Sequence, residues 1–294
     1  MVKKLTAYNK TVNHPSQRIL FLFILTLMII SSIQAQELQE ESVYKFVHYS
    51  SKDGLPQNSV LAIAQDSLGF LWMGTDDGLS RFDGYGFSIF KHNPQHESSI
   101  NNNVIRAITE DPNGFLWIGT EGGGVNVLDP KTEKFRKFQI LDHDKKDLLA
   151  NKVSSTFLDQ RNRLWISTQG DGLIMVTGFG KPAYSGLEEY LSLLNTKYFN
   201  TKNSDLIDDK IWTVSEDRKG NIYIGTLDGG AYVIPIGSEK IERVSFFYQK
   251  GISSVKAFFE DSYGTLWVGT EKHGIWKKEQ GKDIFEAFNF KISN

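Results

Sequence analysis

The sequence predicts an all-β repeat protein, because one phrase returns five times along the chain. The phrase is Asp-x-x-Gly, two residues, then an aromatic residue, an apolar residue, Gly and Thr, and its cleanest copy spans 111–120. The aromatic residues are 45, 48, 58 and 44 residues apart, and they are Trp72, Trp117, Trp165, Tyr223 and Trp267. A period of about 40–50 residues is typical of β-propellers, in which a four-stranded antiparallel sheet recurs as a blade. We therefore expect a propeller with about five blades.

The second repeat shows the strands of one blade most clearly. Its four runs, 104–110, 115–120, 125–128 and 134–140, are short, rich in β-branched and aromatic residues, and bounded by Gly, Pro, Asn or Asp. Such runs are typical of strands joined by tight turns. By the same pattern, the blades are predicted at about 59–93, 102–141, 151–202, 209–248 and 252–290.

The turn residues that recur in each repeat support the same fold. In the second copy Asp111 begins the turn, Pro112 fixes the next φ, and Gly114 takes the left-handed position. The third copy has Asn162 at that position, and Asn tolerates the left-handed conformation best after Gly. Because the aromatic residue recurs at one point of every blade, we interpret it as an anchor that packs between blades rather than as a sugar-stacking platform. The Gly that follows it, Ser167 in one copy, allows neighbouring blades to approach closely.

Two segments compete for the outermost place of the last blade. Residues 43–49 form an apolar and aromatic run ahead of the first repeat, which predicts an N-terminal strand. Residues 284–290 already supply a fourth strand for the fifth repeat. We therefore expect an incomplete ring, whose end blades expose apolar sheet faces and make the chain only marginally stable.

The first 35 residues have the features of a cleavable secretory signal peptide. They contain no acidic residue, and their basic residues are Lys3, Lys4, Lys10 and Arg18. The apolar run 19–30 is shorter than the roughly 20 residues that span a bilayer. We expect cleavage after Ala35, a short linker over 36–42, and a propeller over 43–294 in the periplasm. An uncleaved membrane anchor is the alternative.

Composition narrows the classes of partner. Removal of four positive charges with the signal peptide takes the formal net charge from −2 to −6, which argues against nucleic acid and anionic membranes as partners. The chain has no cysteine, so it forms no disulfide and carries no thiol chemistry. No cofactor is predicted.

The sequence motifs of the first repeat resemble those of a known family. Gly54–Val60, Phe70–Gly78 and Arg81–Gly84 are similar to two-component regulator propeller repeats, and the similarity extends over nearly all of 43–290. The resemblance implies the periplasmic sensor region of a hybrid two-component system of Bacteroidetes-type bacteria, with an oligosaccharide as ligand and a homodimer in the full-length sensor. In that family two seven-bladed propellers precede an immunoglobulin-like domain, a membrane helix and a histidine kinase.

Length separates this chain from the family pattern. The residues left after the signal peptide are too few for seven blades of about 45 residues each. We therefore expect part of a seven-bladed ring that binds a ligand, carries no enzymatic activity, and would reach the membrane only through C-terminal parts that this chain lacks. The alternative is a secreted propeller enzyme acting on glycans, a lyase or hydrolase, with an acid/base group in the central funnel.

One rim of the propeller is the predicted binding site. In an up-and-down blade, the turn between the second and third strands shares a rim with the connection to the next blade, opposite the Asp-x-x-Gly turns. The candidate ligand-binding residues on this rim are Asp76, Asp77, Glu121, Gln169, Asp171, Asp228, Glu271 and His273. Lys272, Asn58 and Asn101–Asn103 belong to the same rim. Carboxylates and amides suit polyhydroxylated ligands; ordinary polar turn composition is the other interpretation.

Two further clusters are interpreted as polar loops, and no metal or catalytic residue is predicted. Pro94 between His92 and His96 excludes a regular helix, so these histidines do not share a helical face. The aspartates 142, 144 and 147 lack the Gly and Glu of a calcium loop. The spacing of 58 marks an insertion between Thr177 and Lys197, where 187–194 has helical periodicity. We expect this short helix to cap a blade rather than to form a lip over a site.

Overall fold

The computed structural model describes residues 45–139, 152–180 and 184–289. The chain divides into two compact units, Met1–His48 and Tyr49–Asn294. Only 45–48 of the first unit are described, and they are exposed and without regular structure. The predicted signal peptide, the linker and the aspartates of 142–147 lie outside the described residues. None of the described helices is long and apolar enough to cross a membrane.

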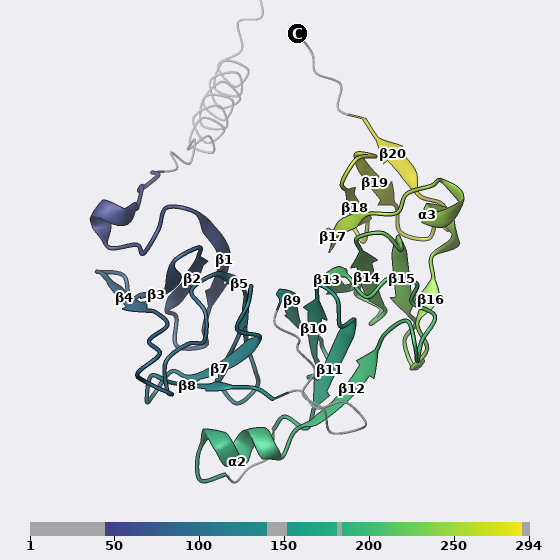
Figure 1. Ribbon diagram of the computed structural model, residues 1–294. Coiled ribbons are helices and arrows are strands. Elements are labelled where there is room, and N and C mark those ends of the chain that lie inside the picture. The colour runs from purple at the N-terminus through teal and green to yellow at the C-terminus, as the bar shows by residue number, and fades with distance from the viewer. Residues whose placement is uncertain (1–44, 140–151, 181–183, 290–294) are drawn as a thin grey trace, which may run out of the picture. The chain divides into compact units, whose positions relative to one another are not determined.

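The described residues of the second unit form five four-stranded antiparallel sheets, which confirms the predicted fold class (Figure 1). Strands follow chain order within each sheet, so strands that are neighbours in the chain are also neighbours in the sheet. Sheet one contains β1 (Val60–Gln65), β2 (Leu71–Thr75), β3 (Gly78–Phe82) and β4 (Phe87–Phe90). Sheet two contains β5 (Ile105–Glu110), β6 (Leu116–Thr120), β7 (Val125–Asp129) and β8 (Lys134–Lys137).

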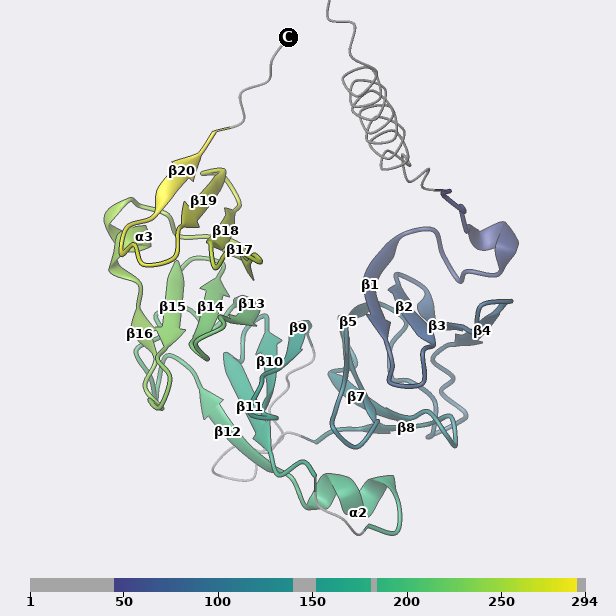
Figure 2. The ribbon, with the colours of Figure 1, turned by 180° about the vertical axis from the view of Figure 1, so that it is seen from behind.

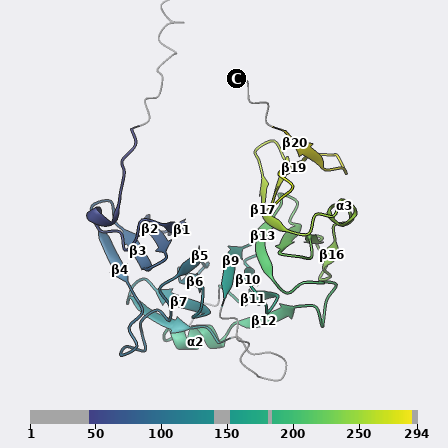
Figure 3. The same cartoon turned by 45° about the horizontal axis from the view of Figure 1, so that its top comes forward.

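The other three sheets repeat this plan. Sheet three contains β9 (Val153–Leu158), β10 (Leu164–Thr168), β11 (Leu173–Thr177) and β12 (Asn195–Phe199). Sheet four contains β13 (Ile211–Glu216), β14 (Ile222–Thr226), β15 (Ala231–Ile234) and β16 (Glu242–Arg243). Sheet five contains β17 (Val255–Glu260), β18 (Leu266–Thr270), β19 (Ile275–Lys278) and β20 (Glu286–Phe288). Figure 3 shows the first strand of each sheet on the inner side of this unit, and β4, β12 and β16 on its outer side.

Each Asp-x-x-Gly turn is held by its own aspartate. In sheet two, Oδ1 of Asp111 accepts the backbone N–H groups of Asn113 at 2.8 Å and Phe115 at 3.1 Å. Its Oδ2 accepts the indole N–H of Trp117 at 2.7 Å. The fourth turn position is left-handed in every copy, and Asn162 adopts it with φ 55°. The aspartate therefore ties the turn to the aromatic anchor of the same sheet, a contact that recurs for Trp72, Trp165 and Trp267.

The apolar core lies between sheets. Trp117 is buried among residues of sheet three such as Val153 and Ile166, and Tyr223 is buried among residues of sheet five. Trp72 and Trp165 pack in the same way against sheets two and four. The structure thus places four of the five anchors between consecutive sheets, whereas Trp267 of the last sheet is half-buried.

In sheets one, two and four, the glycine two residues after the anchor lies against the first strand of the next sheet. A Cβ on Gly119 would lie 2.4 Å from Cγ1 of Val153, and one on Gly74 would lie 2.6 Å from Cγ2 of Ile105. Val153 and Ile105 are the first residues of β9 and β5, where one extra residue bulges each first strand. A Cβ on Gly225 would lie 2.6 Å from the carbonyl oxygen of Val255 of β17 and 3.1 Å from Cγ1 of the same residue. Close approach of a β-branched side chain to a glycine is therefore the common feature of these junctions.

A glutamate at the end of the first strand fastens most junctions. Glu110 accepts the N–H and the hydroxyl of Ser67 in the preceding turn, both at 2.7 Å. Glu216 accepts the Gln160 N–H at 2.8 Å, and Glu260 accepts that of Arg218. The junction between sheets two and three lacks this bond. Pro112, which has no N–H, stands at the position of Ser67, and Leu158 stands at the position of Glu110.

The insertion in sheet three supplies other contacts at that junction. Its helix α2 (Leu187–Ser192) packs Tyr190 onto Phe115 of sheet two, with ring centroids 4.5 Å apart. The Tyr190 hydroxyl donates to Oδ2 of Asp111 at 2.6 Å. Figure 2 shows α2 beside β7 and β8 of sheet two. The predicted helix therefore exists and covers the turn of a neighbouring blade.

Two features differ from expectation. The predicted strand over 43–49 is wrong for its described part, since 45–49 form no strand. The fourth place of sheet five is filled by β20 from its own repeat. Helix α3 (Ser245–Gln249), which leads from sheet four to sheet five, does not follow from the repeat pattern. It buries Phe247 against Phe285, with ring centroids 4.8 Å apart.

Candidate functional site

The predicted rim is built from the turns between second and third strands and the connections between sheets. The N–H of Glu121 donates to the carbonyl of Val104 at 3.0 Å, and that of Gln169 to the carbonyl of Lys152 at 2.9 Å. Gly78, in the equivalent turn of sheet one, donates to the carbonyl of Asn103 at 2.8 Å. These bonds place the predicted turn residues beside the connection residues.

Most rim carboxylates face a cation. Asp77 pairs with Lys91 at 2.6 Å, and Glu121 pairs with Arg106. The remaining pairs are looser, with Asp228 3.9 Å from Lys210 and Glu271 3.5 Å from Lys256. The rim therefore presents donors and acceptors side by side rather than an anionic surface.

Asp171 is held in a different environment. Burial raises the pKa of its carboxyl above the ordinary value, and the nearby carboxylate of Asp209 adds to the shift. Its backbone N–H donates to Oγ1 of Thr168 at 2.9 Å, which fixes the turn. Among the predicted residues, four are exposed: Asp76, Asp228, Glu271 and His273.

The rim asparagines organise the connections. Oδ1 of Asn103 accepts the N–H of His92 at 2.7 Å, and Oδ1 of Asn102 accepts that of Val104 at 2.8 Å. Oδ1 of Asn58 accepts the N–H of Ser51 at 2.8 Å. These side-chain oxygens are occupied by backbone groups, so the asparagines shape the rim.

Sequence reasoning missed the bulged residues of the first strands. Trp212 lies at the second position of β13, and Nζ of Lys256, from the same position of β17, is 3.5 Å from the Trp212 ring centroid. Arg106 and Ser154 occupy this position in β5 and β9. The Trp212 indole N–H is buried and has no acceptor among the described residues. Aligning the repeats by their first strands would have identified this row, because it falls between a β-branched residue and Ala, Ser or Thr.

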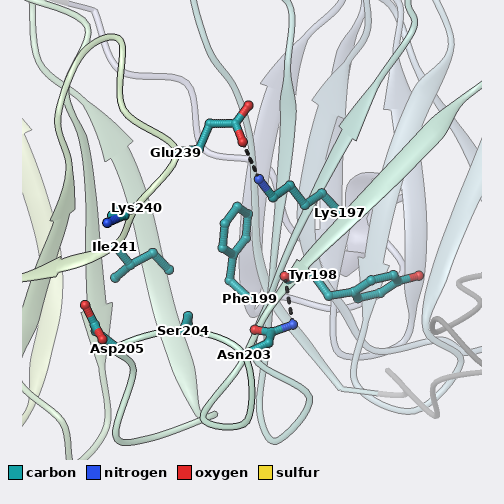
Figure 4. A pocket seen from close by; sticks show the side chains of 9 residues that line it. All are labelled: Lys197, Tyr198, Phe199, Asn203, Ser204, Asp205, Glu239, Lys240 and Ile241. Carbon is teal, nitrogen blue, oxygen red and sulfur yellow. Dashed lines mark hydrogen bonds and ion pairs between the residues drawn. The ribbon is translucent and has the colours of Figure 1, made fainter.

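A cavity of about 510 Å³ lies at the outer strands of sheets three and four (Figure 4). Lys197 of β12 meets Glu239 at 2.7 Å, and its Nζ lies 5.3 Å from the ring centroid of Phe199. Phe199 is only 5% exposed, so its ring offers little stacking surface. Figure 4 shows the ring of Tyr198 pointing away from the other labelled side chains. None of the predicted rim residues lines this cavity.

The histidine pair lies in a loop, as expected. Nδ1 of His92 is 2.8 Å from the carbonyl of Ile100, and the N–H of His96 donates to the carbonyl of Asn93. Across the described part of the chain, no group of three or more His, Asp or Glu side chains is arranged to hold a metal ion.

Comparison with known proteins gives a consistent result. Four stretches, 54–77, 99–122, 205–228 and 251–272, match the family described as two component regulator propeller. The chain is 42% identical over 80 residues to "Histidine kinase P4" of Formosa agariphila, which covers 27% of this chain and 6% of that protein.

Solved structures show the same fold. The extracellular domain of BT3049 from B. thetaiotaomicron, named as a hybrid two component system, superposes with a TM-score of 0.67 at 26% identity, over 82% of this chain and 31% of that one. Virginiamycin B lyase from Staphylococcus aureus superposes with a TM-score of 0.56 at 16% identity, over 81% of this chain and 72% of that one, which shows a shared fold alone. The chain thus spans about a third of BT3049's extracellular domain and a small part of the kinase.

Proposed function

We propose that this chain, which is built of two-component regulator propeller repeats, is a sensor propeller that binds an oligosaccharide outside the cytoplasm. The observation that carries the proposal is the likeness to the extracellular domain of a hybrid two component system over 82% of the chain. The F. agariphila relative is named as a histidine kinase. In a protein of that kind the propeller would bind the ligand, and the kinase would report it.

The chemistry of the rim supports a neutral, hydroxyl-rich ligand. Its carboxylates alternate with Lys and Arg side chains, as in the pair of Asp77 and Lys91 at 2.6 Å. A sugar hydroxyl both donates and accepts, so it can bridge such a pair without an unpaired charge being buried. The exposed Asp76 and the half-exposed Asp171 add acceptors next to these pairs.

Calorimetric titration of the chain with a panel of oligosaccharides tests this function. We expect saturable binding of at least one oligosaccharide, with the sugar recovered unchanged. Asp76→Asn and Asp171→Asn keep the shape of the side chains and should weaken binding at least severalfold, because hydrogen bonds to charged groups contribute about 1.5–3 kcal/mol. Asp283→Asn, an exposed site in the turn between β19 and β20 on the opposite rim, is the matched control.

Two results would contradict the proposal. Cleavage or elimination of the sugar by the purified chain would make it an enzyme. If Asp76→Asn and Asp171→Asn bind the sugar as tightly as the unchanged chain and the control Asp283→Asn do, the binding site lies away from the predicted rim.

A further inference from the structure

The second residues of the first strands form a row along the inner side of the sheets. The row consists of Leu61, Arg106, Ser154, Trp212 and Lys256. The strands that carry it lie on the inner side of the unit in Figure 3. In each of them the pairing with the second strand skips this residue, as in a β-bulge, which turns a side chain in a new direction. The row contains a single aromatic side chain, that of Trp212.

Trp212 stands next to the predicted rim. Two residues before it, the carbonyl of Lys210 accepts the N–H of Leu227 at 2.9 Å, beside the rim residue Asp228. The indole is half-buried, so part of its surface is open to solvent. Trp212 therefore offers an apolar ring next to the polar groups of the rim.

A cation from sheet five lies over this ring. Nζ of Lys256 is 3.5 Å from the Trp212 ring centroid, which is a close cation–π contact. The same ammonium is 3.5 Å from the carboxylate of Glu271, longer than the roughly 2.7–2.9 Å of a hydrogen bond between charged groups. Glu271 also accepts the hydroxyl of Ser254 at 2.8 Å, which holds the carboxylate in place. Lys256 thus divides its charge between the ring and the carboxylate.

Sheet two shows the same two positions in another arrangement. Arg106 stands at the position of Lys256, and Glu121 stands at the position of Glu271. Nε of Arg106 donates to the Glu121 carboxylate at 2.7 Å, so this charge pair is closed. If Lys256 moved off the indole, it could form the equivalent closed pair with Glu271.

We infer that Trp212 stacks against one sugar ring of the ligand, and that Lys256 moves from the indole to Glu271 when the sugar binds. The inference rests on the proposed function, because it extends the binding site of the rim onto the inner row. The C–H face of a pyranose is apolar and weakly positive, so it can replace the ammonium over the negative face of the indole. The hydroxyls at the edge of the same ring would meet donors and acceptors of the rim. The ligand class is therefore an oligosaccharide built of pyranose rings.

Calorimetric titration with the tightest-binding pyranose oligosaccharide of the panel tests this inference. Trp212→Leu keeps an apolar side chain without the ring and should weaken binding about tenfold. Lys256→Ala uncovers the ring and should strengthen binding about twofold, because no cation has to leave the indole. Tyr263→Leu is the matched control, since it removes an exposed ring from an Asp-x-x-Gly turn on the opposite rim and should bind like the unchanged chain.

Tryptophan fluorescence reports the stacking directly. Saturation with the sugar should change the emission of the unchanged chain and of Tyr263→Leu. The emission of Trp212→Leu should stay the same at saturation, because its other tryptophans lie outside the contact. An emission change of full size in Trp212→Leu would overturn the inference.

The outcomes separate this inference from the proposed function. If Trp212→Leu keeps full affinity while Asp76→Asn binds weakly, the sugar contacts the rim alone; the inference then fails and the proposed function stands. If no oligosaccharide binds to the unchanged chain, both fail. If Trp212→Leu loses the circular dichroism of the unchanged chain, Lys256→Ala decides, and equal or weaker binding by that variant overturns the inference.

Discussion

Replacement of Gly119 by Ala tests whether the sheets need a glycine where they meet. The added Cβ would lie 2.4 Å from Cγ1 of Val153 and 3.0 Å from its Cβ. Val153 is fully buried at the start of β9, so its side chain has little room to move aside. The same substitution at Gly269 meets only Ala257 at 3.5 Å, which is an ordinary contact.

The two substitutions should therefore change the free energy of unfolding differently. Overpacking a well-filled core costs about 1–3 kcal/mol. Ala restricts the unfolded chain more than Gly does, and this raises the free energy of unfolding by about 0.4–1 kcal/mol where the native conformation tolerates Ala. We expect Gly119→Ala to lower the free energy of unfolding by about 1–2 kcal/mol and Gly269→Ala to leave it unchanged or slightly raised.

Urea unfolding followed by tryptophan fluorescence measures the difference. The slope of free energy against urea should be unchanged in both variants, so that the shift in midpoint reports stability. If Gly119→Ala proves as stable as Gly269→Ala, the close approach of β-branched residues to the anchor glycines does not determine how the sheets pack.

Three other predictions follow from the described contacts. Tyr190→Phe removes the hydroxyl that donates to Asp111 and should lower the free energy of unfolding by about 1.5–3 kcal/mol, whereas Tyr263→Phe, 83% exposed, should have no effect in urea unfolding. Burial raises the pKa of the Asp111 carboxyl in the folded chain. Its contribution to the free energy of unfolding is therefore complete below the unfolded pKa of about 3.9 and is lost as pH rises through the folded pKa. The free energy of unfolding of the unchanged chain, relative to Asp111→Asn, should fall over that pH interval, and a constant difference would refute this. Intact mass of the exported protein should show Gln36 as the first residue, and a species retaining 1–35 would contradict cleavage after Ala35.

The local part of the fold could be predicted because each repeat carries its own turn chemistry. The left-handed conformation of Asn162 follows from its place in the turn, and the strands follow from short β-branched runs. Five copies of one pattern also make the sheet count clear. These features depend on residues close in sequence, which a single sequence displays directly.

Contacts between repeats could not be predicted in the same way. The helix of the insertion is visible in its periodicity, but its contact with Asp111 joins residues far apart in the chain. The fastening of Ser67 by Glu110 is likewise a contact between repeats. The rim residues could be assigned to one side from topology alone, while their pairing with cations such as Lys91 and Arg106 depends on side-chain positions that only the structure supplies.

At the junction between sheets two and three, Pro112 and Leu158 stand where the other junctions have an N–H donor and a glutamate. A repeat copied into a new position would bring its own edge residues with it, and these must match both neighbours. A glutamate set against Pro112 would meet a residue with no N–H to donate, and Leu158 set against Ser67 would leave the Ser67 N–H without a protein acceptor. The order of the repeats along the chain is therefore part of what the junctions specify, because a repeat moved elsewhere would meet a neighbour without the matching donor or acceptor.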